Sequence, residues 1–147
     1  MNLGHPFHGH VLGDLLLDVR AIAQQGGEIA LQIARAIEDI SALLRGEKKS
    51  LRAVQLDMSR VPAFNARVYE TARAIPPGTT RTYGDIARAV AAPAQAVGQA
   101  CGANPLPILI PCHRVLGAKG LGGFSAKGGV ETKVWLLRHE GAAGLLI

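Results

Sequence analysis

Proline and glycine divide the last two-thirds of this chain into short segments. Residues 76–78 (Pro-Pro-Gly) and Pro93 each end a helical pattern, since proline lacks a backbone donor and its ring clashes with the preceding helical turn. Between positions 117 and 129, six of thirteen residues are glycine, which predicts a loop or a wide hairpin. These breaks leave room for short helices only, joined by turns and one glycine-rich loop.

Four helices are expected between these breaks, at about 62–75, 83–90, 94–102 and 130–139. Proline is tolerated in a first helical turn, so Pro62 fits the start of the first helix. The helices at 83–90 and 94–102 flank a tight turn, which is the pattern of a helix-turn-helix. In the last helix the apolar residues that we expect to face inward are Val134, Trp135, Leu136 and Leu137.

The first third of the chain is also expected to be helical. A short helix at 13–24 ends at Gly26 and Gly27, and a second follows at 28–45. Its apolar residues recur at helical spacing and share one face: Ile29, Ile33, Ile37, Ile40 and Leu44. Residues 51–58 form either a short strand or an extended linker at a lobe boundary. Residues 1–12 are interpreted as a loose arm, and its His5, His8 and His10 lack the partner spacing of a metal site.

Composition excludes several classes of protein. Hydrophobic residues make up 48% of the 147 residues and charged residues 18%, so the chain can bury a core and is not disordered by composition. Two cysteines exclude a disulfide scaffold, and without a secretory signal they favour a reducing compartment. No stretch has the length of a membrane span. We therefore expect a cytoplasmic protein that does not contact membranes.

The positive charge is concentrated in one part of the chain. Residues 1–50 carry a net charge of −1 and residues 51–147 a net charge of +6. A basic surface suits a phosphate-rich partner such as nucleic acid, although it can also be an ordinary solvated face.

The sequence Ile110-Pro111-Cys112-His113-Arg114 holds the candidate chemistry. If Cys112 opens a helical turn, nearby backbone N–H groups and the Arg114 cation favour a thiolate. His113 is a candidate base, and one bridging water is more plausible than direct contact because neighbouring side chains point apart. Its orienting carboxylate is either Glu131 or Glu140. A buried structural cysteine is the alternative.

Three stretches together resemble the O6-alkylguanine-DNA alkyltransferases, also called methylated-DNA–protein-cysteine methyltransferases. They are TRTYGDIARAV, NPLPILIPCHRVLG and GGFSAKGGVETKVWLLRHEG, and the resemblance runs from about Arg60 to Gly141. It implies a mainly α (α+β) fold. Residues 59–147 would form a winged helix-turn-helix-like domain for DNA binding and catalysis, after a reduced, mostly helical N-terminal lobe at 1–58. Family members often carry a β-sheet lobe there, sometimes with a metal, but residues 1–58 look mainly helical, so no metal is expected. No cofactor and a monomer are also expected.

The resemblance also implies a function. Such a protein binds double-stranded DNA in the minor groove, rotates an O6-alkylguanine out of the helix and takes the alkyl group onto a cysteine in a single turnover. O4-alkylthymine is a possible second substrate. Two alternatives remain open at this stage: a non-catalytic sensor of alkylguanine, and a winged-helix regulator that uses Cys112 as a redox or alkyl sensor.

Roles are carried over residue by residue. Cys112 resembles the alkyl acceptor, His113 the water-linked base and Glu140 the carboxylate that polarises it. Tyr83 resembles the tyrosine that crowds the 3′ phosphate, and Ser125 a pocket residue near the guanine oxygen.

Further positions of the resemblance concern the turn before the cysteine and the surface for DNA. Asn104 resembles the asparagine that braces that turn and is also expected in the substrate pocket. Arg114 and Ala94 are predicted DNA contacts. Gln95 stands where the family usually has an arginine that fills the gap left by the flipped base, and Arg88 is a candidate to compensate. Cys101 is predicted to be a small packed residue.

Overall fold

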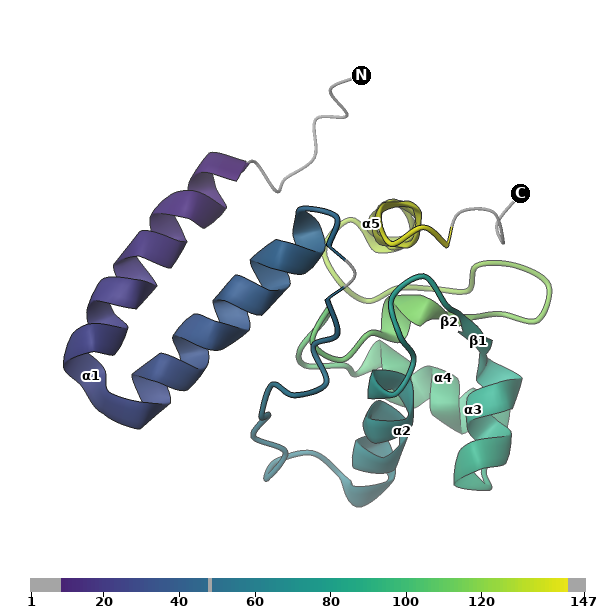
Figure 1. The fold of residues 1–147 in the computed structure, drawn as a ribbon. Helices are drawn as coiled ribbons and strands as arrows, with labels where there is room; N and C mark the ends of the chain where they lie inside the picture. Colours follow the sequence, from purple (N-terminus) through teal and green to yellow (C-terminus); the bar gives the residue numbers. More distant parts are fainter. Residues whose placement is uncertain (1–8, 48, 143–147) are drawn as a thin grey trace.

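The computed structural model describes residues 9–47 and 49–142, and side-chain surroundings from Gly27 onward. Figure 1 shows the order of the elements along the chain. They are α1 (Gly9–Leu44), α2 (Ala63–Arg73), β1 (Arg81–Thr82), α3 (Tyr83–Val90), α4 (Ala94–Gly102), the 3-10 turn η1 (Cys112–Arg114), β2 (Val115–Leu116) and α5 (Gly129–His139). The predicted mainly α fold with a small β component is confirmed.

The predicted break in the N-terminal helices is confirmed at Gly27. This residue has φ 77° and ψ −159°, a conformation that glycine alone adopts without strain, and the chain folds back on itself there (Figure 1). The first half of α1 begins at Gly9, so the prediction of a loose arm is wrong for residues 9–12. His5 and His8 lie outside the described residues.

The second half of α1 buries a different face from the one that its apolar spacing indicates. Ile29 is 74% exposed and Ile33 52%. Leu43 is buried together with several smaller residues of the same helix. These residues are buried because α1 contacts the rest of the molecule mainly at its C-terminal end. There Nε2 of His139 lies 3.0 Å from the carbonyl oxygen of Leu43.

Helices α2, α3 and α4 pack on one another and form the main core. Tyr69 of α2 is buried, and its hydroxyl donates a hydrogen bond of 2.8 Å to the carbonyl of Ala100 in α4. Helix α3 begins with a capping box, in which Thr82 and Asp85 each bond the other's backbone N–H. It ends at Ala91, which has a left-handed φ of 52°. The predicted helix-turn-helix is therefore present.

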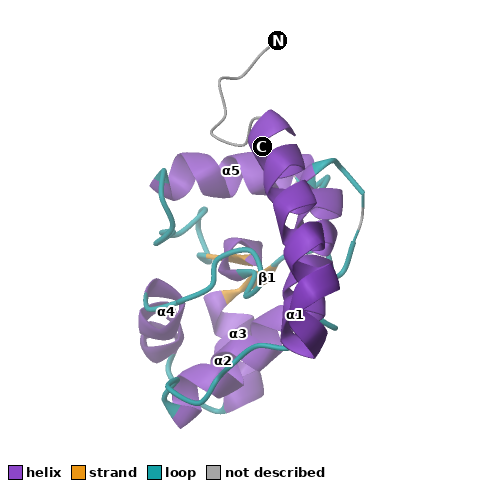
Figure 2. Ribbon diagram, turned by 90° about the vertical axis from the view of Figure 1, so that its left-hand side faces the viewer, coloured by secondary structure: helices purple, strands orange, loops and turns teal. Residues whose placement is uncertain are grey.

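The sheet is parallel and has two short strands, with Arg81 opposite Val115 and Thr82 opposite Leu116. Figure 2 shows it between α5 and the group of α2, α3 and α4. It connects the start of α3 to the segment that follows Cys112. The strand pairing thereby holds the segment around Cys112 against the helix-turn-helix.

The chain turns at residues 106–110, where Ile108 adopts a φ of 77° and only Ile110 is buried. Residues 51–58 contain no strand, so the extended linker is the correct alternative. One expectation needs correction. Trp135 is half-buried and stacks on His139 at 4.7 Å between ring centroids, whereas the inward residues of α5 include Lys133 and Leu137. No helix in the described ranges is long and apolar enough to cross a membrane.

Candidate active site

A cavity of about 400 Å³ brings together three of the predicted site residues: Tyr83, Cys112 and Ser125. Its wall also includes residues of α4 and of the glycine-rich loop, namely Gly98, Cys101, Gly102, Gly123 and Phe124. The cavity therefore lies between the second helix of the helix-turn-helix, the cysteine segment and that loop. Ligand cavities commonly have this concave form, with few polar groups.

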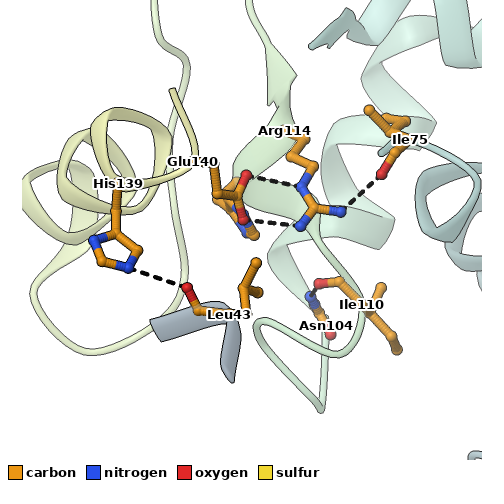
Figure 3. Close-up of polar contacts among 8 residues, drawn as sticks. Leu43, Ile75, Asn104, Ile110, Arg114, His139 and Glu140 are labelled. Carbon is orange, nitrogen blue, oxygen red and sulfur yellow. Dashed lines mark hydrogen bonds and ion pairs between the residues drawn. The ribbon is translucent and has the colours of Figure 1, made fainter. Parts of the chain in front are cut away.

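Cys112 is held in place by the turn that precedes it. The side chain of Asn104 donates a 2.8 Å hydrogen bond to the carbonyl of Ile110 and accepts one of 2.9 Å from the N–H of Leu106. Asn104 thus bridges the turn, and Figure 3 shows it beside Ile110. Asn104, which was expected in the substrate pocket, is not among the residues that line the cavity. Pro111 follows and Cys112 opens η1, so the thiol is placed where the buried backbone changes direction.

A buried carboxylate connects the residues that follow the cysteine. Glu140 accepts hydrogen bonds from Nε and Nη2 of Arg114 at 2.9 and 2.8 Å, and its Oε1 lies 2.8 Å from Nε2 of His113. Arg114 also donates from Nη1 to the carbonyl of Ile75 at 2.7 Å. Figure 3 shows the carboxylate facing the guanidinium. Of the two predicted candidates, Glu140 is the partner of His113.

This placement contradicts the prediction that Arg114 contacts DNA. Its side chain is 4% exposed, and its guanidinium is fully engaged by Glu140 and Ile75. A buried ion pair of this kind needs such complete hydrogen bonding to offset the loss of water. Arg114 therefore orients the carboxylate from inside the molecule.

The protonation of His113 follows from that of Glu140. Burial alone would raise the pKa of Glu140, but hydrogen bonds from His113 and Arg114 outweigh it and lower the pKa to about 2. An ionised carboxylate only accepts hydrogen bonds, so Nε2 of His113 carries the proton. Burial lowers the pKa of His113, which keeps the ring neutral. Its Nδ1 is then an acceptor, and it is buried with no partner among the described residues.

The thiol of Cys112 is protonated at neutral pH, which differs from the thiolate expected from its position. A hydrogen bond with Cys101 and then burial raise its pKa, and the charge of Lys133 opposes them only partly. The side chain belongs to the hydrophobic core, where a charged form loses its hydration. Loss of the proton must therefore accompany the reaction of the sulfur.

The sequence of this chain is similar to those of known proteins from one family. The family described as 6-O-methylguanine DNA methyltransferase, DNA binding domain, matches residues 63–142. The chain belongs to this methyltransferase family. A methylated-DNA–protein-cysteine methyltransferase of Salmonella typhimurium is 51% identical over 81 residues, which are 53% of this chain and 46% of that protein. A probable one of Acanthamoeba polyphaga mimivirus is 37% identical over 110 residues, 74% of this chain and 72% of the relative.

Solved structures of the methyltransferase family include similar folds. Mycobacterium tuberculosis OGT in complex with DNA has a TM-score of 0.65 and 42% identity, over 74% of this chain and 65% of that chain. The chain spans about half the length of the Salmonella relative and about two-thirds of that OGT chain.

Lys133 is a site residue that sequence reasoning missed. It is buried on α5, and its ammonium donates to the carbonyls of Val115 at 2.7 Å and Gly123 at 3.1 Å. Burial lowers its pKa to about 8, and the ammonium lies 5.8 Å from the ring centroid of Tyr83. One signal was available: Lys133 shares a helical face with the apolar Leu136 and Leu137, at spacings of three and four residues.

The start of α4 lies on the surface of the molecule. Ala94 and Gln95 are exposed there, as the prediction of DNA contacts requires. Tyr83, the first residue of α3, is half-buried and lines the cavity. Arg88 is exposed and paired with Asp85. No group of three or more potential metal ligands occurs in the part of the chain that the structure describes.

Proposed function

We propose that this protein repairs DNA by moving an alkyl group, typically methyl, from O6 of guanine to Sγ of Cys112 in a single turnover. The observation that carries the proposal is the cavity that Cys112 shares with Tyr83 and Ser125, backed by the His113–Glu140 pair. The names of the relatives support it, since those proteins are called methylated-DNA–protein-cysteine methyltransferases.

The chemistry needs a base beside a protonated thiol. One water between Sγ of Cys112 and Nδ1 of His113 would pass the thiol proton to the ring, while Glu140 stabilises the charge that forms there. The sulfur then attacks the methyl carbon, the S–C bond forms and the C–O6 bond breaks. The guanine leaves as an anion and takes up a proton, so that a thioether and an unmodified guanine result. Regeneration would require the cysteine thiolate to leave from the methyl carbon of the thioether, and a thiolate is a poor leaving group there, which makes the protein single-use.

The methyl group must reach the cavity from within a duplex. Base extrusion provides this access and costs a few kcal/mol, least for poorly paired lesions. In this proposal Tyr83, which lines the cavity and begins α3, crowds the adjoining phosphate. Ser125, which also lines the cavity, turns its hydroxyl from the carbonyl of Cys101, 3.5 Å away, to donate a hydrogen bond to the O6 atom.

DNA binding would be mainly electrostatic. Residues 51–147 carry a net charge of +6, and phosphate contacts give affinity that falls steeply with salt and depends little on sequence. We propose that residues 59–147 form the unit that binds and reacts, that O4-alkylthymine is a possible second substrate, and that the protein acts as a cytoplasmic monomer.

Intact-protein mass spectrometry tests the transfer directly. After incubation with duplex DNA that contains O6-methylguanine, the protein should gain the mass of one methyl group, and peptide mapping should place it on Cys112 and not on Cys101. Unmodified duplex is the control. The variant Cys112→Ala should bind the DNA and gain no mass. Binding by the wild type without a mass gain, or a gain on another residue, would refute the proposal.

A further inference from the structure

The alkyl acceptor has a second thiol beside it. Cys101 lies near the end of α4 and Cys112 opens η1, and these are the two cysteines of the chain. Both line the same cavity and both belong to the same buried cluster. Each thiol shifts the pKa of the other, which agrees with their position as neighbours in one cavity.

The space around the pair lets a small molecule reach it. A Cβ added at Gly98 or Gly102 would meet no atom within 4 Å, so the α4 side of the cavity is open next to Cys101. The cavity volume of about 400 Å³ exceeds what a small oxidant needs.

The environment also favours a thiolate on one member of the pair. The hydrogen bond from Cys112 lowers the pKa of Cys101, burial opposes this, and the charge of Lys133 lowers it further. A thiolate is the form of cysteine that hydroperoxides oxidise. Its neighbour is then in position to attack the oxidised sulfur.

We propose that Cys101 and Cys112 form a reversible intramolecular disulfide in the presence of a hydroperoxide. The Cys101 thiolate attacks one peroxide oxygen and the O–O bond breaks, which gives a sulfenic acid and, after proton uptake, water or an alcohol. The Cys112 thiol attacks the sulfenic sulfur, the S–S bond forms, and hydroxide leaves with the thiol proton as water. The two thiols lose two electrons and the peroxide gains them.

The disulfide has a consequence for repair that rests on the proposed function. A sulfur atom in a disulfide is not a thiolate and cannot attack a methyl carbon, so the oxidised protein cannot accept an alkyl group. Reduction restores the acceptor. The disulfide therefore masks a single-use sulfur during oxidative stress and protects it from irreversible oxidation to the sulfinic or sulfonic acid.

The test uses the full chain, reduced and then treated with hydrogen peroxide. Intact mass should fall by two hydrogens. After unfolding in urea, iodoacetamide should label no thiol in the oxidised sample and two in the reduced one. Methyl transfer should fall on the order of tenfold or more, because only a free thiolate can form the thioether, and dithiothreitol should restore it. Cys101→Ser and Cys112→Ser are matched controls that should never lose two hydrogens.

The outcomes separate the two proposals. Wild-type protein that keeps two labelled thiols, gains oxygen atoms or forms disulfide-linked dimers overturns the intramolecular disulfide. A loss of two hydrogens in a protein that never accepts methyl, even when reduced, supports the disulfide and overturns the repair function. The mass and the thiol count do not depend on alkyl transfer.

Discussion

At the scale of single residues, Glu140 stabilises two buried groups at once. It bonds Arg114 and His113 inside the molecule, and removing one member of a buried pair leaves an uncompensated charge. We expect Glu140→Gln to lower the free energy of unfolding by about 3–5 kcal/mol at neutral pH and to slow alkyl transfer. Urea unfolding measures the first effect. Glu131→Gln, on an exposed residue of the same helix, is the control and should change little.

The same carboxylate predicts the behaviour in acid. Its pKa is lowered in the folded protein from 4.5 to about 2, so the unfolded state binds more protons in this interval. The stabilisation is complete above pH 4.5 and is lost as the pH falls through about 2. The difference in stability between wild type and Glu140→Gln should therefore narrow on acidification, as followed by circular dichroism. A constant difference would mean that Glu140 is not paired.

Lys133 gives a dependence of the same sign in an alkaline range of pH. The folded chain releases this proton near pH 8, whereas an ordinary lysine holds it to 10.5, so stability rises with pH between these values. Between pH 8 and 10.5, the free energy of unfolding of the wild type, measured with urea, should rise relative to that of Lys133→Met. At pH 7 the variant should already be less stable by roughly 1–3 kcal/mol, because the Val115 carbonyl loses its donor. The exposed Lys127→Met should follow wild type throughout.

Among the elements, α3 ends in a strained conformation. Ala91 has φ 52° and ψ 52°, which glycine adopts at lower cost than alanine. The bonds from Ala91 and Ala92 to the last turn are already in place, so no rearrangement is needed. We expect Ala91→Gly to raise the free energy of unfolding by about 0.5–1 kcal/mol. Ala89→Gly, inside the same helix, should lower the free energy of unfolding by about 1 kcal/mol. Changes of the same sign in the two variants would contradict this prediction.

Helix α4 presents Gln95 where the family usually has arginine. An arginine both stacks on neighbouring bases and hydrogen-bonds the base left unpaired, so Gln95→Arg should tighten DNA binding or speed transfer. Gln95→Ala should weaken it by roughly 0.5–1.5 kcal/mol, about one hydrogen bond. Single-turnover transfer rates on duplex DNA are the measurement. Gln99→Arg adds the same charge one turn later and controls for electrostatics; equal rates for all forms would show that another residue fills the gap.

For the whole molecule, the attachment of α1 depends on its end. Leu43 is 2% exposed and Ile33 52%, although the apolar spacing singled out Ile33. Leu43→Ala should lower the free energy of unfolding by about 2–5 kcal/mol, whereas Ile33→Ala should stay within about 0.5 kcal/mol. Urea unfolding of the two variants compares them. A large loss for Ile33→Ala would show that this exposed face is covered in solution.

The success of sequence reasoning depended on how local each signal was. Helix ends at Gly27 and Pro93 were predictable because the backbone restriction lies in the residue itself. Arg114 was misplaced because its partner Glu140 is 26 residues away. Lys133 was missed because a charged residue on a helix is ordinarily solvated.

The sequence pattern was a poor guide to burial where a residue packs against an element that is distant in the sequence. The apolar stripe of α1 correctly predicted a helix, but its buried side depends on where α5 lies. The resemblance placed Cys112, Tyr83 and Ser125 correctly in one cavity. It could not predict that Cys101 lines the same cavity as Cys112.

The carboxylate of Glu140 also sets when during its synthesis this protein becomes competent. Glu140 follows α5. It bonds Arg114 of η1, and Arg114 in turn bonds the carbonyl of Ile75 after α2. On the ribosome, Cys112 and His113 emerge before the residue that completes their pairing. A nascent chain shorter than 140 residues therefore has the sulfur without the assembled base, and in the proposed reaction it would not spend its single-use acceptor before translation has passed that point.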